Sequence, residues 1–277
     1  MHITATFLRK HNMSVGLIEP CFDNLHDLLK HMEVPMTPLP EAILADPTQV
    51  YRLLEKHASN LDAIFLVDPN NPTGTSMFSD GPETFVEVAR YCRDHKKILI
   101  LDFCFASFLK VSGRKRVDAY AILDEVGTDY LVMEDTGKTW PLQDTKCATL
   151  MSSQRLNPEI YSIVTSVLLN VSPFILQLVT EYINDSEADG FASVRDVLQT
   201  NRKAAREYLD VSTWTARCCV TSNRPSKPVW PGLRFNETTC PAMTFRRTCW
   251  SIKPTCFPAA ISSGAIRSSD DPMFASR

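Results

Sequence analysis

The fold is decided by residues 63–74, which read AIFLVDPNNPTG. The first five residues are apolar and include β-branched and aromatic side chains, which predicts a short buried strand. The remaining seven contain Asp, Asn, Pro and Gly, which predicts a turn directly after that strand. In open α/β sheets, ligands bind at the carboxyl ends of the strands, so the turn is a candidate binding segment.

Two further segments of the chain repeat this pattern of an apolar strand followed by polar residues. Residues 98–101 are apolar and lead into Asp102, and the apolar residues 130–133 lead into a segment that ends at Lys138. Each of the three predicted strands is therefore followed by one chemically distinctive side chain, which is Asn71, Asp102 or Lys138. Parallel strands place their carboxyl ends at one edge of the sheet, so we expect these three side chains to lie together.

Helix signals alternate with these strands, which predicts an α/β fold with a mainly parallel sheet flanked by helices. Asp46 and Pro47 are typical of a helix start, because Asp caps the first turn and Pro fits its first position. Further helices are predicted from Pro82 and over residues 117–126. Residues 151–209 are mostly helical in pattern, and within them we expect residues 160–179 to form a buried helix pair rather than a membrane span. Residues 1–209 are assigned to one large domain.

The composition changes near residue 210. Residues 211–277 contain seven of the 18 prolines and five of the nine cysteines, and they show neither helical nor strand periodicity. We interpret residues 210–277 as an irregular or degraded remnant of a second, small domain. A shifted reading frame would give this composition.

The bulk composition excludes several functional classes. A net charge of −3 gives no support to nucleic-acid binding. The first residues lack the basic and apolar regions of a signal peptide, so we expect a cytoplasmic protein with free thiols. The nine cysteines include no Cys-x-x-Cys pair, so no metal site is predicted.

Taken in order, these motifs resemble those of the fold-type-I pyridoxal-phosphate enzymes, and specifically the class I and II aminotransferases. Asn71-Pro72-Thr73-Gly74 is similar to the Asn-Pro-x-Gly motif of that family. Residues 102–105 correspond to its Asp-x-x-Tyr motif, and residues 135–138 correspond to its Ser-x-x-Lys motif. The resemblance covers about residues 8–208, and it implies pyridoxal 5'-phosphate as the cofactor.

The resemblance gives each residue a role. Lys138 would form an imine with the cofactor and later move a substrate proton, while Asp102 would keep the cofactor's ring nitrogen protonated. Asn71 would donate a hydrogen bond to the ring's phenolate oxygen. Phe22 would stack on the ring, and Lys146 would bind the phosphate as a point charge where the family usually has Arg.

The chain also departs from the family pattern. Phe105 replaces a Tyr whose hydroxyl reaches the phenolate oxygen, and Asp135 replaces a Ser that commonly touches the phosphate. Gly137 replaces a small hydroxyl residue. The family's phosphate-binding loop lies in a segment that precedes Met1, and the only glycine before residue 70 is Gly16.

The resemblance implies an enzyme that transfers an amino group between an amino acid and a 2-oxo acid. Two alternatives stay open. One is another reaction on the same fold, such as that of a lyase, a decarboxylase or an oxidase, because a fold does not fix a reaction. The other is a catalytically inactive fragment. No nucleic-acid or membrane partner is predicted, and the resemblance implies a homodimer for the intact parent.

Overall fold

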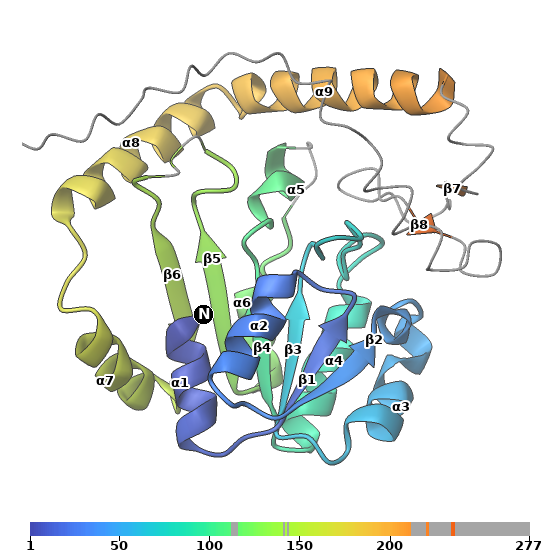
Figure 1. Ribbon diagram of the computed structural model, residues 1–277, viewed down its shortest axis with the longest axis vertical. Helices are drawn as coiled ribbons and strands as arrows, with labels where there is room; N and C mark the ends of the chain where they lie inside the picture. Colours follow the sequence, from blue (N-terminus) through green and yellow to red (C-terminus); the bar gives the residue numbers. More distant parts are fainter. Residues whose placement is uncertain (112–115, 141, 143, 212–219, 222–233, 236–277) are drawn as a thin grey trace, which may run out of the picture. The chain divides into compact units, whose positions relative to one another are not determined.

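The protein is described by a computed structural model that covers residues 1–111, 116–140, 142, 144–211, 220–221 and 234–235. A six-stranded sheet forms its centre, with helices on both faces (Figure 1). The strand order is β2-β1-β3-β4-β5-β6. The strands are β1 (Val15–Glu19), β2 (Met36–Pro40), β3 (Ala63–Val67), β4 (Ile98–Asp102), β5 (Tyr130–Asp135) and β6 (Ala148–Ser152).

The sheet is parallel except at one edge, which confirms the predicted α/β class. β1 pairs in parallel with β2 and β3, β3 pairs in parallel with β4, and β4 pairs in parallel with β5. Only β6 runs antiparallel to its neighbour, β5. All five residues of β3 are buried, as are the first four of β4 and of β5. Strands that are covered on both faces read as continuous apolar runs, which is why these three were visible in the sequence.

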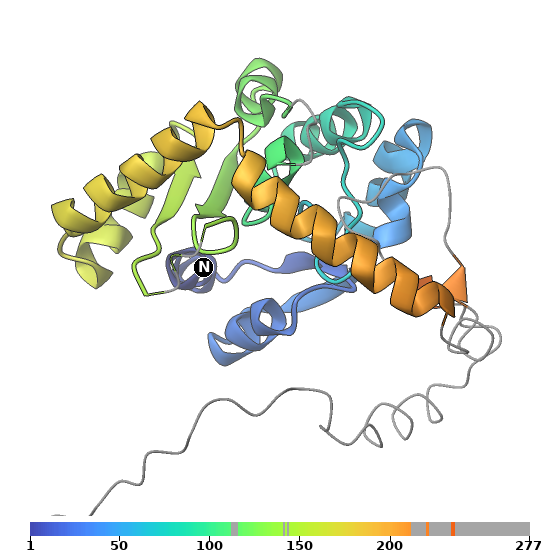
Figure 2. The same cartoon turned by 90° about the horizontal axis from the view of Figure 1, so that it is seen from above.

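The helices cover the two faces of the sheet (Figure 2). On one face, α4 packs between α3 and α6, and on the other, α1 packs against α2 and α7. The helices up to residue 126 are α1 (His2–Lys10), α2 (Asp23–His31), α3 (Pro47–Ala58), α4 (Glu83–Asp94), α5 (Ser107–Val111) and α6 (Ala119–Val126), with the short 3-10 helix η1 (Glu41–Leu44).

Two of the predicted helix starts are confirmed by their capping contacts. The side chain of Asp46 accepts a hydrogen bond from the backbone N–H of Thr48, and Pro47 occupies the first turn of α3. Asp118 caps α6 in the same way, so this helix begins at Ala119, two residues after the predicted start. A cap of this kind satisfies a backbone donor that the helix itself leaves unpaired.

The two edge strands were not predicted from the sequence. β2 contains Pro38 and Pro40, which are tolerated because an edge strand has one side without a partner strand. β6 has mostly exposed or half-exposed residues, so it lacks the apolar run that marks a buried strand. Its pairing with β5 nevertheless brings residues 146–148 next to residues 135–136.

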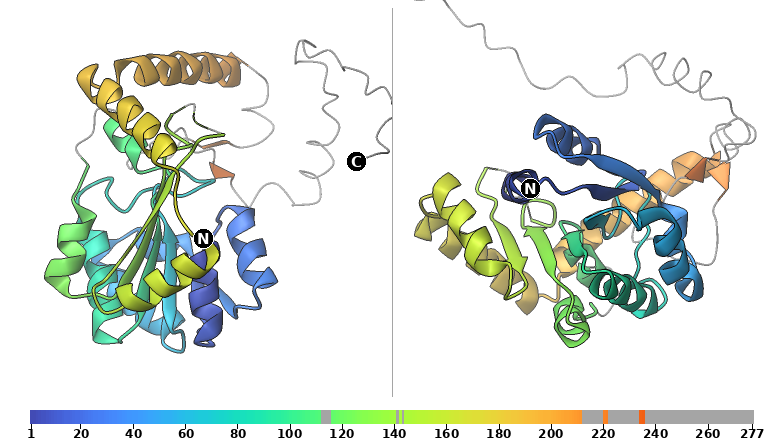
Figure 3. Two further views of the ribbon diagram at one scale, coloured as in Figure 1. Left: turned by 90° about the vertical axis from the view of Figure 1, so that its left-hand side faces the viewer. Right: turned by 90° about the horizontal axis from the view of Figure 1, so that it is seen from below.

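Residues 157–211 form three helices, α7 (Asn157–Val167), α8 (Pro173–Ala188) and α9 (Ala192–Val211), seen from the side in Figure 3. The predicted helix pair within residues 160–179 is therefore present, but the prediction that it is buried was wrong. Leu169 is 94% exposed and Phe174 is 73% exposed. Apolar composition indicates that a face favours a partner, but it does not show that the described part of the chain supplies one. None of the described helices is long and apolar enough to cross a membrane.

A second, smaller apolar cluster joins α8 and α9 to the rest of the fold. Its buried members are Phe108, Val111, Trp140, Leu142, Val179 and Phe191. The indole N–H of Trp140 donates to the Ser186 hydroxyl at 2.8 Å, so this contact links the segment after β5 to α8. The predicted small-domain remnant, residues 210–277, lies almost entirely outside the described residues.

Candidate functional site

The three predicted strand-end motifs lie side by side at the carboxyl edge of the sheet. Val67 at the end of β3 pairs with Asp102 at the end of β4, and Asp102 pairs with Met133 in β5. The contacts continue beyond the strands, because Asp68 N–H donates to the carbonyl of Asp102 at 3.0 Å. Asn71, Asp102 and Lys138 therefore follow three adjacent strands.

The Cys104 thiol shows which charged groups meet at this edge. Burial raises the pKa of Cys104 above its ordinary value, and the charge of Asp102 and a hydrogen bond to it raise the pKa further. Asp135 raises the pKa as well, while Lys138 lowers it. Asp102, Asp135 and Lys138 all lie at the carboxyl ends of the adjacent strands β4 and β5 or in the turn that follows β5. We define these four residues as the strand-end cluster.

Asp102 is the last residue of β4, so this strand is one residue longer than the sequence predicted. Its Oδ1 accepts a hydrogen bond from the backbone N–H of Cys104 at 3.0 Å, which fixes the carboxylate at the start of the following turn. Asp102 is half-buried, so it is partly shielded from water. The capping contact uses one oxygen and is compatible with a second contact to a ligand.

The turn that carries Lys138 is held from both sides. Asp135 Oδ1 accepts from the backbone N–H of Gly137 at 2.7 Å, so this carboxylate is turned into its own turn. On the other side, the stem of Lys146 packs so closely that a Cβ at Gly137 would lie 2.8 Å from its Cδ. A glycine is therefore required here unless Lys146 moves. Lys138 itself is exposed.

The loop that carries Asn71 is fixed by two carboxylates that the sequence did not single out. Asp68 is buried and accepts from the Ser76 hydroxyl at 2.8 Å and from the Met77 N–H at 2.6 Å. Glu41 approaches from the end of β2 and accepts from three side chains of the loop. Asp68 is part of the motif over residues 63–74, so the sequence predicted that it follows β3. Glu41 lies in no motif, so the sequence did not predict its contact with this loop.

The two aromatic residues that the sequence predicted for the site, Phe22 and Phe105, differ in burial. Phe22 directly precedes α2 at the same edge of the sheet and stays 39% exposed. Phe105 is half-buried and packs on the second apolar cluster, with its ring centroid 6.0 Å from that of Phe108. The stacking role of Phe22 remains a prediction.

The start of α1 also lies at this edge. The amino group of Met1 is largely buried, and burial lowers its pKa, while Asp102 and Cys104 raise it. Met1 therefore lies within electrostatic range of the strand-end cluster.

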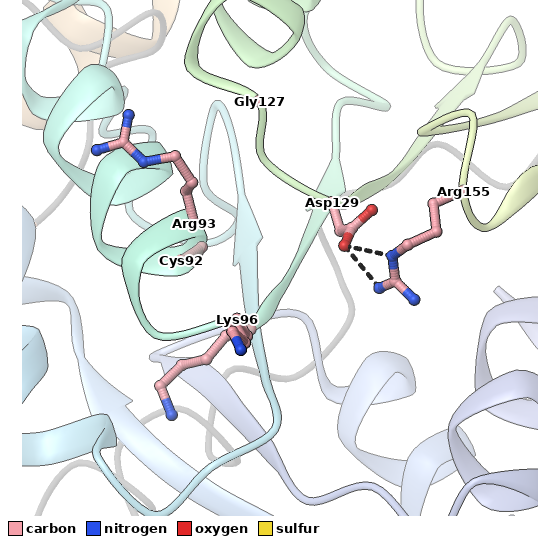
Figure 4. Close-up of a pocket in the computed structure, with 7 residues that line it drawn as sticks. Cys92, Arg93, Lys96, Gly127, Asp129 and Arg155 are labelled. Carbon is pink, nitrogen blue, oxygen red and sulfur yellow. Dashed lines mark hydrogen bonds and ion pairs between the residues drawn. The ribbon is translucent and has the colours of Figure 1, made fainter.

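A hollow of about 350 Å³ lies at the opposite edge of the sheet, where β4 and β5 begin (Figure 4). Its lining includes Arg93, Lys96, Asp129 and Arg155. The guanidinium of Arg155 donates from Nε to Asp129 Oδ2 at 2.7 Å, whereas Arg93 points away from this pair. The cations do not converge on one point, so we assign the hollow no ligand.

Comparisons to known proteins show the family of this chain. A family model described as aminotransferase class I and II matches residues 2–223. The chain belongs to this family. The match extends the resemblance found in the sequence to α1 and past the end of α9.

Individual aminotransferases are similar over parts of the chain. A histidinol-phosphate aminotransferase 2 of Haemophilus influenzae is 25% identical over 149 residues, which are 53% of this chain and 36% of that protein. A histidinol-phosphate aminotransferase of Helicobacter hepaticus is 23% identical over 158 residues, 56% of this chain and 41% of that protein. The chain thus spans less than half the length of the two curated relatives.

Several solved structures are similar to this chain in fold. The protein MppP, solved after soaking with the product 2-ketoarginine, is 33% identical with a TM-score of 0.66, and the match covers 76% of this chain and 56% of MppP. Aspartate aminotransferase from Thermus thermophilus with maleate is 16% identical with a TM-score of 0.59, over 82% of this chain and 58% of that one. The second likeness concerns the fold alone.

Proposed function

We propose that this protein is a pyridoxal-phosphate-dependent aminotransferase that moves an amino group between an amino acid and a 2-oxo acid. The observation that carries the proposal is the strand-end cluster, in which an acid, Asp102, ends β4 and an amine, Lys138, follows the adjacent strand β5 at the same edge of the sheet. Family membership supports the cofactor, and one similar solved structure is described as a PLP-bound putative aminotransferase.

The residues present fit this cofactor. Its ring nitrogen requires an acid, and Asp102 is partly shielded and fixed by the Cys104 N–H. Its phosphate requires a cation, and Lys146 packs beside Gly137, while the carboxylate of Asp135 is bound to the turn instead of being left free. Asn70 Oδ1 and Thr139 Oγ1, in the loops after β3 and β5, are buried and have no hydrogen-bond partner among the described residues.

The chain's own residues then have separate tasks. Bound at this edge, the cofactor supplies an aldehyde carbon and an electron-accepting ring. Lys138 Nζ would bind the cofactor covalently and would move the substrate proton, and Asp102 would hold a proton on the ring nitrogen. Asn71 would donate to the phenolate oxygen, and Phe22 would cover one ring face. Lys146 would neutralise part of the phosphate charge.

Replacing Asp102 by alanine is expected to lower turnover while leaving the cofactor covalently bound. The loss of a charged partner costs about 3 kcal/mol, which corresponds to a kcat reduced roughly 100-fold. Single-turnover kinetics with a saturating amino acid measure this step. The control is Asp80→Ala, which removes an exposed carboxylate from the segment between β3 and α4. A variant with wild-type kcat would contradict the role given to Asp102.

Replacing Lys146 by alanine is expected to weaken cofactor binding more than turnover. The phosphate then loses one charged partner, which raises the Kd for pyridoxal phosphate roughly tenfold to 100-fold. Fluorescence titration of the cofactor-free protein measures the Kd, and kcat is measured at saturating cofactor. An unchanged Kd with a reduced kcat would contradict phosphate binding by Lys146.

A second candidate function is formation of a 2-oxo acid without an amino acceptor, as in an oxidase. The 33% identity to MppP, whose product is 2-ketoarginine, is compatible with both functions, since either reaction removes the amino group of arginine. The two functions differ in one measurement. An aminotransferase forms a new amino acid only when a 2-oxo acid is added, whereas an oxidase forms its 2-oxo acid from the amino acid, dioxygen and water without a 2-oxo acceptor, and it releases ammonia and hydrogen peroxide. Arginine and aspartate are suitable first substrates for both assays.

The cellular location, the domain boundaries and the oligomeric state are proposals as well. We infer that the protein is cytoplasmic and that residues 1–209 form its large, cofactor-binding domain, with 210–277 belonging to a second region. The exposed apolar residues of α8 and of the segment between α7 and α8, such as Phe174 and Leu169, support a homodimer, because exposed apolar side chains favour association. Light scattering of the purified chain measures its mass.

A further inference from the structure

Glu41 binds the loop that carries Asn71, although the two residues lie thirty positions apart. It is the first residue of η1 and follows the edge strand β2. Its Oε1 accepts from Asn70 Nδ2 at 2.8 Å and from the Thr73 hydroxyl at 2.5 Å. The Thr75 hydroxyl donates to the same oxygen. One carboxylate oxygen therefore collects three donors from a single loop.

The loop closes around these contacts. The backbone N–H of Asn70 donates to the carbonyl of Thr75 at 2.8 Å, and the N–H of Gly74 donates to the carbonyl of Asn70 at 2.7 Å. The second amide hydrogen of Asn70 goes to the carbonyl of Pro20 at 2.9 Å. Asn71 is enclosed in this turn, so its backbone is placed by bonds on both sides of it.

We propose that Glu41 is a positioning residue, which holds the loop so that Asn71 meets the cofactor's phenolate oxygen. The inference rests on the proposed function for the cofactor contact, but the hold on the loop is independent of it. Hydrogen bonds to an ionised acceptor are about twice as strong as neutral ones, so a carboxylate suits three converging donors. Alanine at position 41 would leave the donors of Asn70, Thr73 and Thr75 without this acceptor.

The first test measures the loop in the cofactor-free chain of residues 1–277. Native-state hydrogen exchange reports the N–H groups of Asn70 and Gly74, which are bonded within the loop. In Glu41→Ala we expect both to exchange at least about tenfold faster, the factor for losing roughly one net hydrogen bond. Glu41→Gln keeps an acceptor oxygen without the charge, and its exchange rates should lie between those of the wild type and Glu41→Ala.

The matched control is Glu19→Ala, which removes an exposed carboxylate at the end of β1 on the same edge. It should leave the exchange of Asn70 and Gly74 unchanged. Circular dichroism shows whether each variant folds. If Glu41→Ala does not fold, the exchange rates are compared between the wild type and Glu41→Gln. Unchanged exchange in a folded Glu41 variant, or an equal increase in Glu19→Ala, would overturn the inference.

The second test concerns the cofactor. In Glu41→Ala, the Kd for pyridoxal phosphate should rise about tenfold, and the absorbance band of the bound cofactor should titrate at a shifted pH, because Asn71 no longer stabilises the phenolate. Faster exchange with an unchanged Kd and band would overturn the positioning role. If the wild type itself binds no cofactor, the proposed function fails, and the exchange rates still decide whether Glu41 holds the loop.

Discussion

Lys138→Ala is expected to abolish covalent cofactor binding completely. A side chain without an amine forms no bond to the aldehyde carbon, and we assign this bond to Lys138 alone. The variant should lack the absorbance band of the bound cofactor at every pyridoxal phosphate concentration, and it should have no turnover. The expected loss exceeds that of any other substitution proposed for this site, since it removes the reacting group itself.

The control for Lys138→Ala is Lys30→Ala, which removes an exposed lysine in the last turn of α2. This variant should keep both the absorbance band and the turnover of the wild type. A band that persists in Lys138→Ala would show that another amine holds the cofactor. Because Lys138 is exposed, we expect its removal to leave the free energy of unfolding within about 0.5 kcal/mol of the wild type.

Asp68→Asn is expected to remove most of the pH dependence of stability between about pH 4 and pH 8. Burial raises the pKa of Asp68 from 3.8 to about 7, against the hydrogen bonds from Met77 and Ser76, and the charge of Glu41 raises it further. The folded state therefore favours the protonated carboxyl. Its contribution to stability is complete below the unfolded pKa and is lost as the pH rises towards 7.

The size of this effect follows from the shift in pKa. A change of roughly three pKa units corresponds to about 4 kcal/mol, so the unfolding free energy of the wild type should fall by about that much more than that of Asp68→Asn. Urea unfolding of both proteins across this pH range measures the difference. Parallel pH profiles for the two proteins would show that Asp68 is not the group responsible.

The central strands and the ends of those strands could be predicted from the sequence because their physics is local. β3, β4 and β5 are covered on both faces, so they appear as apolar runs; Asp102 directly follows one such run, and Lys138 lies in the short segment after another. Asp46 with Pro47 marked the start of α3 for a similarly local reason, since a cap acts within one turn.

The parts that could not be predicted depend on distant neighbours. Glu41 has no local pattern, because its three donors come from residues 70–75. The edge strand β6 is half exposed and is defined by its pairing with β5. The exposure of Leu169 and Phe174 was missed for the same reason, because an apolar run shows a preference for burial and not the presence of a covering partner.

The capping contact of Asp135 shows how structure changes the interpretation of a motif. A carboxylate at the position where the family commonly has a phosphate-contacting Ser would repel the phosphate, because like charges repel. Its hydrogen bond to the Gly137 N–H turns it into the chain, and Lys146 packs beside the same glycine. This local arrangement reduces the repulsion that the residue type alone predicted.

Mass spectrometry of the borohydride-reduced cofactor adduct tests the central assignment most directly. The chain of residues 1–277 is incubated with pyridoxal phosphate, reduced and digested, and the modified peptide is identified. We predict one modified lysine, Lys138, in the peptide that follows β5. A reduced adduct on Lys146, or on any lysine other than Lys138, would contradict the assignment.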